Sequence, residues 1–234
     1  MTRSRLLLPW LLLMGIFDPG CAGTETGNPP RASLSLSLES SDAQHFSIGS
    51  AGAGVKITEA QIGIRQLALT ECNAQAVTEV AQGVTVNLRG GESAFEVPEQ
   101  QLCVVELSFG PRDIGWASVD PGANPQLSLG VAGLTTVAAP LFIEDDATPL
   151  VVFRPSTFQV TADSQLILSL DVAKALNFGE IAQLSPNNAG DAVITSQLNG
   201  PILTNIHQRW AASWNLYAVS GGGGKQLIAT GEAQ

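Results

Sequence analysis

The sequence contains few of the residues on which most enzyme chemistry depends. It has two histidines and three cysteines, and no GxSxG string, CxxC pair or DxDxDG calcium loop occurs in it. Charged residues make up 14% of the chain, and 11 basic against 21 acidic residues give a formal net charge of −10. Because so acidic a surface repels phosphate backbones and anionic lipid headgroups, we exclude nucleic-acid binding.

Long hydrophobic runs are also missing, apart from one near the N-terminus. It extends from Leu6 to Phe17, whereas a helix that spans a bilayer needs about 20 apolar residues. Arg3 and Arg5 precede the run, and Gly20 follows it after a short break. A basic start, an apolar centre and a small residue at the cleavage point are the order of a secretory signal.

Cys21 comes directly after Gly20, as in a bacterial lipobox, where the cysteine is diacylated and becomes the mature N-terminus. Asp18 and Pro19 stand where that motif usually has an aliphatic and a small residue. We expect a lipid anchor on Cys21, and the alternative is a secreted protein with a spare cysteine.

The expected organisation has three parts. Residues 1–20 form the lipoprotein signal peptide, the small, polar and Pro-rich residues 21–31 form a flexible tether, and residues 32–234 form a single β-sandwich domain. Removal of 20 of the 234 residues leaves 214, which is ample for a buried core, and a net charge near −11. Two smaller domains are the alternative.

The cysteines that remain agree with export. Cys72 and Cys103 form an even set that could be bridged in an oxidising compartment. Two separate buried thiols are the other interpretation.

Alternation of apolar and polar residues indicates a mainly β protein. Leu34, Leu36 and Leu38 alternate with serines, the pattern of a half-buried strand. Between Ile64 and Leu67 the alternation shifts by one residue, which predicts a β-bulge. About a dozen short strands with frequent turns favour an antiparallel β-sandwich. Further strands are expected at 55–69, 84–88, 94–97, 102–109, 116–119, 126–129, 149–153, 157–160, 166–170, 214–219 and 226–230, residues 49–54 are expected to be a loop, and residues 131–143 show no clean period.

Two short helices are expected in the C-terminal half, near 171–184 and 200–213. Asp171 is a suitable N-cap for the first. Pro201 suits the first turn of the second, and Ile206 and Trp210 lie four apart on one face of it.

Three segments carry a resemblance to a known family: VKITEAQIGIRQLAL, VNLRGGESAFEVPEQQLCVVELSFG and SQLILSLDVAKAL. Together they resemble uncharacterised bacterial lipoproteins of myxobacterial type with a prealbumin-like sandwich. In that family a last strand runs into an aspartate and a short helix, as Leu170-Asp171-Val172 does here. The family's usual glycine–tyrosine pair is replaced by Gln101-Leu102. The resemblance implies the fold and the envelope location, and no activity.

Only His45 and His207 could act as an imidazole base, and neither lies at a recognisable strand-to-helix turn. We expect each to be a solvated histidine.

Carboxylates could serve glycoside hydrolysis or bind calcium. The densest cluster is Glu144-Asp145-Asp146, with Asp163 and Asp171 elsewhere. Consecutive acids in a strand point to opposite faces, so a solvated loop is the expectation and a calcium site the alternative.

Exposed aromatic side chains could form a sugar-binding platform, for which Trp116, Trp210, Trp214 and Tyr217 are candidates. The spacing of Trp210 and Trp214 is more typical of a core. The run Gly221 to Gly224 lacks the lysine that a phosphate loop needs.

These observations predict a lipid-anchored protein of the bacterial cell envelope, at the outer membrane, with a non-enzymatic binding or structural module and no cofactor. Its partners would be the membrane, through the lipid on Cys21, and an envelope protein or glycan. The alternative is a secreted hydrolase that acts through Glu144, Asp145, Asp146 or Asp171.

Overall fold

The computed structural model describes residues 31–39, 47–50, 53–73, 76–89, 94–116, 126–135, 139–181, 183–219 and 224–234. The predicted signal peptide, Cys21 and His45 lie outside the described residues, as do residues 117–119 of one predicted strand.

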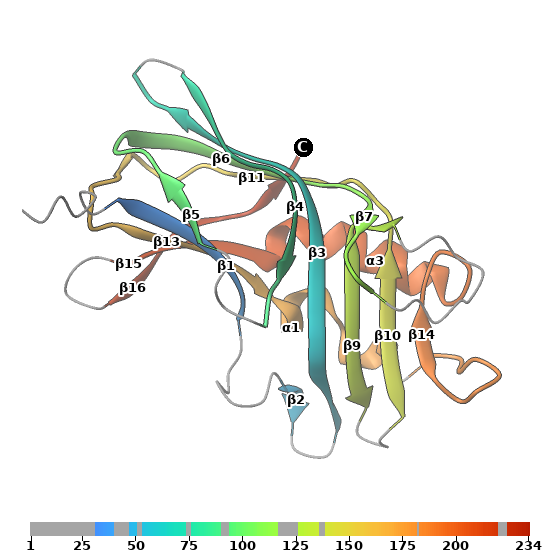
Figure 1. The fold of residues 1–234 in the computed structure, drawn as a ribbon. Helices are drawn as coiled ribbons and strands as arrows, with labels where there is room; N and C mark the ends of the chain where they lie inside the picture. Colours follow the sequence, from blue (N-terminus) through green and yellow to red (C-terminus); the bar gives the residue numbers. More distant parts are fainter. Residues whose placement is uncertain are drawn as a thin grey trace, which may run out of the picture.

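The described residues form two packed β-sheets, a separate two-stranded sheet of β7 and β8, and three short α-helices (Figure 1). The strands are β1 (Ala32–Glu39), β2 (Ser47–Ser50), β3 (Ala53–Glu71), β4 (Val77–Asn87), β5 (Ala94–Val97), β6 (Gln101–Phe109), β7 (Arg112–Asp113), β8 (Gln126–Leu127), β9 (Leu129–Thr135), β10 (Pro140–Asp145), β11 (Leu150–Phe153), β12 (Phe158–Gln159), β13 (Gln165–Asp171), β14 (Ala192–Ile194), β15 (Trp214–Val219), β16 (Lys225–Thr230) and β17 (Glu232–Ala233). The helices are α1 (Val172–Ala175), α2 (Phe178–Ile181) and α3 (Gly200–Trp210), and a 3₁₀ turn (Ala211–Ser213) follows α3.

The predicted mainly β, sandwich-like fold is confirmed. One sheet has five strands in the order β16-β15-β13-β1-β5, and the other has ten strands, with the path β14-β10-β9-β3-β6-β11-β17 and with β2, β4 and β12 attached to it. Most pairs are antiparallel, but β1 pairs with β13 in parallel, and β10 pairs with β14 in parallel. The inward leucines of β1, such as Leu34 and Leu36, are fully buried between the sheets.

Strand β3 is the longest strand, with 19 residues. On one side its first half pairs with β9 and its second half with β6, and the exchange takes place around Gly63. The pairing with β6 shifts register between Ile64 and Gln66, so the bulge predicted between Ile64 and Leu67 is confirmed.

Gly63 is required where β3 exchanges neighbours. Its N–H donates to the Ser128 carbonyl at 2.9 Å, and its carbonyl accepts from the Gly110 N–H at 3.1 Å. A Cβ at this position would lie 2.5 Å from the Gly110 carbonyl oxygen and 3.0 Å from that of Leu127. Because both neighbours are backbone atoms, no side-chain rotation can make room.

The predicted helical regions are both present. The first is divided, since α1 ends at Ala175 and α2 begins at Phe178. Asp171 caps α1 by accepting a hydrogen bond from the Lys174 N–H at 3.2 Å, as predicted. Pro201 lies in the first turn of α3, and Ile206 and Trp210 are buried on its inner face.

One local expectation needs correction. The segment 49–54 is not all loop, because Gly49 and Gly54 pair across the hairpin of β2 and β3. Of residues 131–143, 131–135 belong to β9 and 140–143 to β10, and the two strands pair antiparallel. Their apolar pattern has no clean period because both faces are covered: the inner face packs in the main core, and the outer face carries a small cluster formed by Ile114, Trp116 and Leu127 with Ala132 and Phe142.

Cys72 and Cys103 form a disulfide, with a Cα–Cα distance of 4.9 Å. Cys72 directly follows β3, and Cys103 lies within β6. The bridge therefore joins the central strand to its neighbour beyond the exchange point at Gly63, and the interpretation as two separate thiols is wrong.

Replacement of Gly63 by alanine should lower the free energy of unfolding by about 2 kcal/mol or more, because the new methyl group overlaps two backbone oxygens. Urea denaturation followed by circular dichroism measures the effect. Gly200→Ala is the matched control, since a Cβ there meets nothing within 4 Å, and it should be neutral or slightly stabilising. Equal midpoints for the two variants would contradict the close approach at Gly63.

Loss of the disulfide in a Cys72→Ala/Cys103→Ala variant should lower the free energy of unfolding by about 3–4 kcal/mol, because the bridge closes a loop across 31 residues of the unfolded chain. Alkylation of the unfolded, unreduced protein followed by mass spectrometry gives an independent readout. Neither Cys72 nor Cys103 should be modified before reduction, and two modified thiols would refute the bridge.

Candidate functional site

The acidic triplet does not form one site. Glu144 and Asp145 are the last residues of β10, and Asp146 follows the strand. The Glu144 carboxylate accepts a hydrogen bond from the Trp116 indole N–H at 3.0 Å, whereas Asp145 contacts His207 of α3. The expected solvated loop is wrong for Glu144 and Asp145, which are 6% and 7% exposed, and right only for Asp146.

His207 is held by a carboxylate. Its Nε2 lies 2.8 Å from Oδ2 of Asp145, whose Oδ1 accepts from the Ala147 N–H at 3.1 Å. His207 is solvent-exposed, as expected, with 39% of its side chain accessible, and the carboxylate contact is an addition to that expectation. The nearby hydroxyl of Ser128 donates to the Asp145 carbonyl at 3.0 Å. This pair ties α3 to the end of β10 and leaves Ser128 bonded to backbone.

The other candidate acids lie elsewhere. Asp171 ends β13 in the five-stranded sheet, where it caps α1 and lies 3.4 Å from the Lys174 ammonium. Asp163 is exposed in the turn between Thr161 and Ser164. In the described part of the chain, no three histidine, cysteine, aspartate or glutamate side chains are grouped so that they could hold a metal ion. The structure thus gives no support to the calcium alternative at Glu144, Asp145 and Asp146.

The three tryptophans among the described residues are buried, as the spacing of two of them indicated. Trp210 and Trp214 pack against each other and against Phe109, with ring centroids 5.5 to 5.9 Å apart. Trp116 is 7% exposed. A sugar platform built on tryptophan is therefore absent from the described residues, and of the four candidate aromatics only Tyr217 is partly exposed.

An ion pair between α2 and α3 holds the helices together at one end of the sandwich. Arg209 of α3 donates to the Glu180 carboxylate of α2 at 2.6 Å and to the Ala175 carbonyl of α1 at 3.1 Å. The Arg209 hydrogen bond holds the pKa of Glu180 below its ordinary value, although burial acts in the opposite direction. These contacts hold the three helices together over the core.

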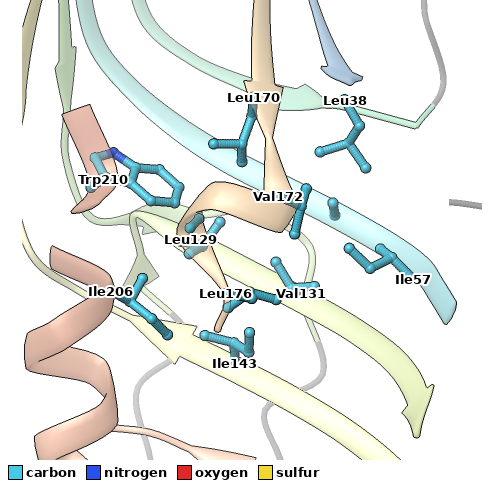
Figure 2. Close-up of a pocket in the computed structure, with 12 residues that line it drawn as sticks. Leu38, Ile57, Leu129, Val131, Ile143, Leu170, Val172, Leu176, Ile206 and Trp210 are labelled. Carbon is cyan, nitrogen blue, oxygen red and sulfur yellow. The ribbon is translucent and has the colours of Figure 1, made fainter. Parts of the chain in front are cut away.

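A small cavity lies beneath these helices (Figure 2). Its lining is apolar and comes from both sheets, α1 and α3, and includes Leu38, Ile57, Val172 and Trp210. Measured as the space open to the centre of a water molecule, the volume of this cavity is only about 10 Å³. A cavity of this size holds at most one water, and a water needs two or more polar partners. The cavity is a packing gap and not a ligand site.

The outer face of the five-stranded sheet carries a polar network that crosses three strands. Glu39 lies on β1 and Tyr217 on β15, with β13 between them. The Glu39 carboxylate accepts from the Tyr217 hydroxyl at 2.7 Å and from the Asn215 side-chain amide at 2.9 Å. The Tyr217 side chain must therefore extend along the sheet, since its hydroxyl reaches a strand two positions away.

A cation covers the ring of this tyrosine. The Lys225 ammonium of β16 lies 3.8 Å from the centroid of the Tyr217 ring. Burial raises the pKa of Tyr217, and the hydrogen bond to Glu39 and the charges of Glu39 and Asp171 raise it further. We call Glu39, Asp171, Asn215, Tyr217 and Lys225 the tyrosine face.

Small and apolar side chains continue the tyrosine face along the sheet. The strand register places Ser35, Ile167, Tyr217 and Leu227 in one row across β1, β13, β15 and β16. The serine and Ile167 are half-buried, and Leu227 is 51% exposed. This row of the sheet therefore carries small, apolar and aromatic side chains and no charged one.

Comparisons of the chain with models of known protein families, with curated proteins and with solved structures found no match. The likeness to envelope lipoproteins stays a prediction. Among the described residues, no helix has the length and apolar character that a membrane crossing requires.

The tyrosine face can be tested by titration, because Tyr217 is the only tyrosine in the chain. Tyrosinate absorbance should develop well above the ordinary pKa of 10.0, and Glu39→Gln should lower the midpoint because it removes the adjacent negative charge. Since the pKa is higher in the folded state, the associated stability is complete below pH 10 and is lost as the pH rises beyond that value. An unchanged midpoint in Glu39→Gln would contradict the contact with Glu39.

Proposed function

We propose that the protein is a lipid-anchored module of the bacterial cell envelope that binds a partner and catalyses no reaction. Diacylated Cys21 holds the chain at the outer membrane, outside the cytoplasm, and residues 32–234 form the binding module. The observation that carries the location is the order of basic residues, apolar run and Gly20-Cys21 at the N-terminus.

The Cys72–Cys103 disulfide supports export, because such bonds persist in oxidising compartments and are rare in the cytosol. It fastens the end of β3 to β6, which suits a domain that works without a reducing system or a folding partner. The same bond gives no information on the lipid itself, for which Cys21 is the only candidate in the sequence.

The arrangement of the acids supports binding over hydrolysis. A glycosidase needs two carboxyl groups about 5–10 Å apart that face one cleft. Glu144 and Asp145 instead contact Trp116 and His207 from opposite faces of β10, and Asp171 belongs to the other sheet. The tyrosine face, by contrast, offers an aromatic ring and polar groups on a firm sheet, which are the elements of a binding surface.

The anchor is tested by replacing Cys21 with serine. Without the thiol no acyl chain can be attached, and the protein should move from the membrane fraction to the soluble fraction and lose label from metabolically supplied palmitate. Gly20→Ala is the matched control, because it keeps a small residue before Cys21, and it should stay in the membrane fraction. A Cys21→Ser variant that remains in washed membranes would refute the lipid anchor.

A further inference from the structure

The Lys225–Tyr217 contact shows that the ring of the tyrosine face can hold a cation. An ammonium over an aromatic ring is attracted by the negative face of the ring, and at an exposed site the interaction is worth about 0.5–1 kcal/mol. Lys225 is exposed and lies at the start of β16. It can leave the ring at low cost, so that a cation from outside could take its position.

The surroundings of the ring favour a cation over a neutral group. Glu39 is bonded to the Tyr217 hydroxyl, and Asp171 is close enough for its charge to raise the pKa of that hydroxyl. The Glu39 carboxylate accepts hydrogen bonds from two neutral donors, Tyr217 and Asn215, so these contacts do not neutralise its charge. Lys174 offsets part of the charge of Asp171, but its side chain is 53% exposed and the pair is separated by 3.4 Å.

The charge of the whole chain acts in the same direction. The protein is acidic, with a net charge of −10, and several of its cations are already paired with acids, as in Arg31–Glu96, Arg154–Glu232 and Arg209–Glu180. An acidic surface attracts a basic partner over distances of about 10 Å and speeds its association. Basic proteins and peptides are therefore the partners that the electrostatic field selects.

The shape of the surface suits an extended segment. Ser33, Ser35 and Ser37 lie on β1, two strands from Tyr217, and their short side chains project little from the sheet. In Figure 1 the helices lie toward β9, β10 and β14, away from the β15–β16 hairpin. Leu227, half exposed at the end of the same row, offers an apolar contact beside the charged one.

We propose that the tyrosine face docks a basic segment of a partner protein, with a lysine or arginine side chain seated on the Tyr217 ring between Glu39 and Asp171 in place of Lys225. The inference rests on the proposed binding function and names the surface and the chemistry of the partner. Lys225 acts as an internal competitor that occupies the ring until the partner arrives.

The test uses the single tyrosine as a probe. Full-length protein labelled with ring-¹³C tyrosine, in a non-ionic detergent, is titrated with a synthetic peptide of alternating lysine and serine, and with a peptide of alternating glutamate and serine. Increasing concentrations of the lysine peptide should shift the Tyr217 ring signals until the shift reaches a plateau, and binding should be weaker at high salt. The glutamate peptide should leave the signals unchanged.

The Lys225→Gln variant should bind the lysine peptide about two- to fivefold more tightly, because the internal cation no longer occupies the ring. A gain in affinity cannot arise from misfolding. Lys56→Gln is the matched control, since Lys56 is exposed on β3 of the other sheet and its loss makes the same change in net charge. It should leave the affinity nearly unchanged.

The Glu39→Gln/Asp171→Asn variant should bind the lysine peptide about threefold or more weakly, since two surface charge pairs are lost. Asparagine at position 171 can still cap α1. Glu79→Gln/Glu106→Gln removes two acids from β4 and β6 of the other sheet and should have little effect.

Three results would overturn the proposal: no shift of the Tyr217 signals with the lysine peptide, equal affinities for Lys225→Gln and Lys56→Gln, or a shift with a neutral chito-oligosaccharide alone, which would assign the face to a sugar. None of these would affect the Cys21→Ser result, so the anchored module would stand with a different docking surface.

Discussion

The close approach of three backbone segments at Gly63 is the constraint on which the larger sheet depends. β3 can exchange β9 for β6 only if its N–H and carbonyl bond outward to Ser128 and Gly110 at the same residue. The absence of a side chain lets those two segments lie against it. The bulge after Ile64 and the disulfide at Cys72 follow within ten residues, so that the second half of β3 is fixed to β6 by both hydrogen bonds and a covalent bond.

Much of the fold could be predicted because alternation reports which face of a strand is buried. The leucines of β1 and β13, the bulge after Ile64 and the cap at Asp171 were all visible in the sequence and are present in the structure. Neighbours were not visible. Leu34 lies opposite Leu166 in a parallel pair, and no local pattern shows that two strands so far apart in the chain will pair.

Buried charges were the largest failure of sequence reasoning, for a physical reason. Glu144 and Asp145 carry charges that are costly to bury, so a loop was the natural expectation. Their burial becomes acceptable because Trp116 and His207 supply hydrogen bonds from positions 28 and 62 residues away. The same distance concealed the tyrosine face: alternation could place Tyr217 outward, but its partner Glu39 lies 178 residues earlier.

The order of residues along β1 relates the proposed anchor to the tyrosine face. The strand begins at Ala32, eleven residues after Cys21, and a chain of that length reaches at most about 40 Å. Glu39 stands at the opposite end of the same strand, about 23 Å further on at the usual rise per residue. The carboxylates that would receive a basic partner are thus at the end of β1 farther from the tether. In the proposed anchored protein an acidic site benefits from this position, because the repulsion between its carboxylates and anionic lipid headgroups falls off within about 10 Å of the membrane surface.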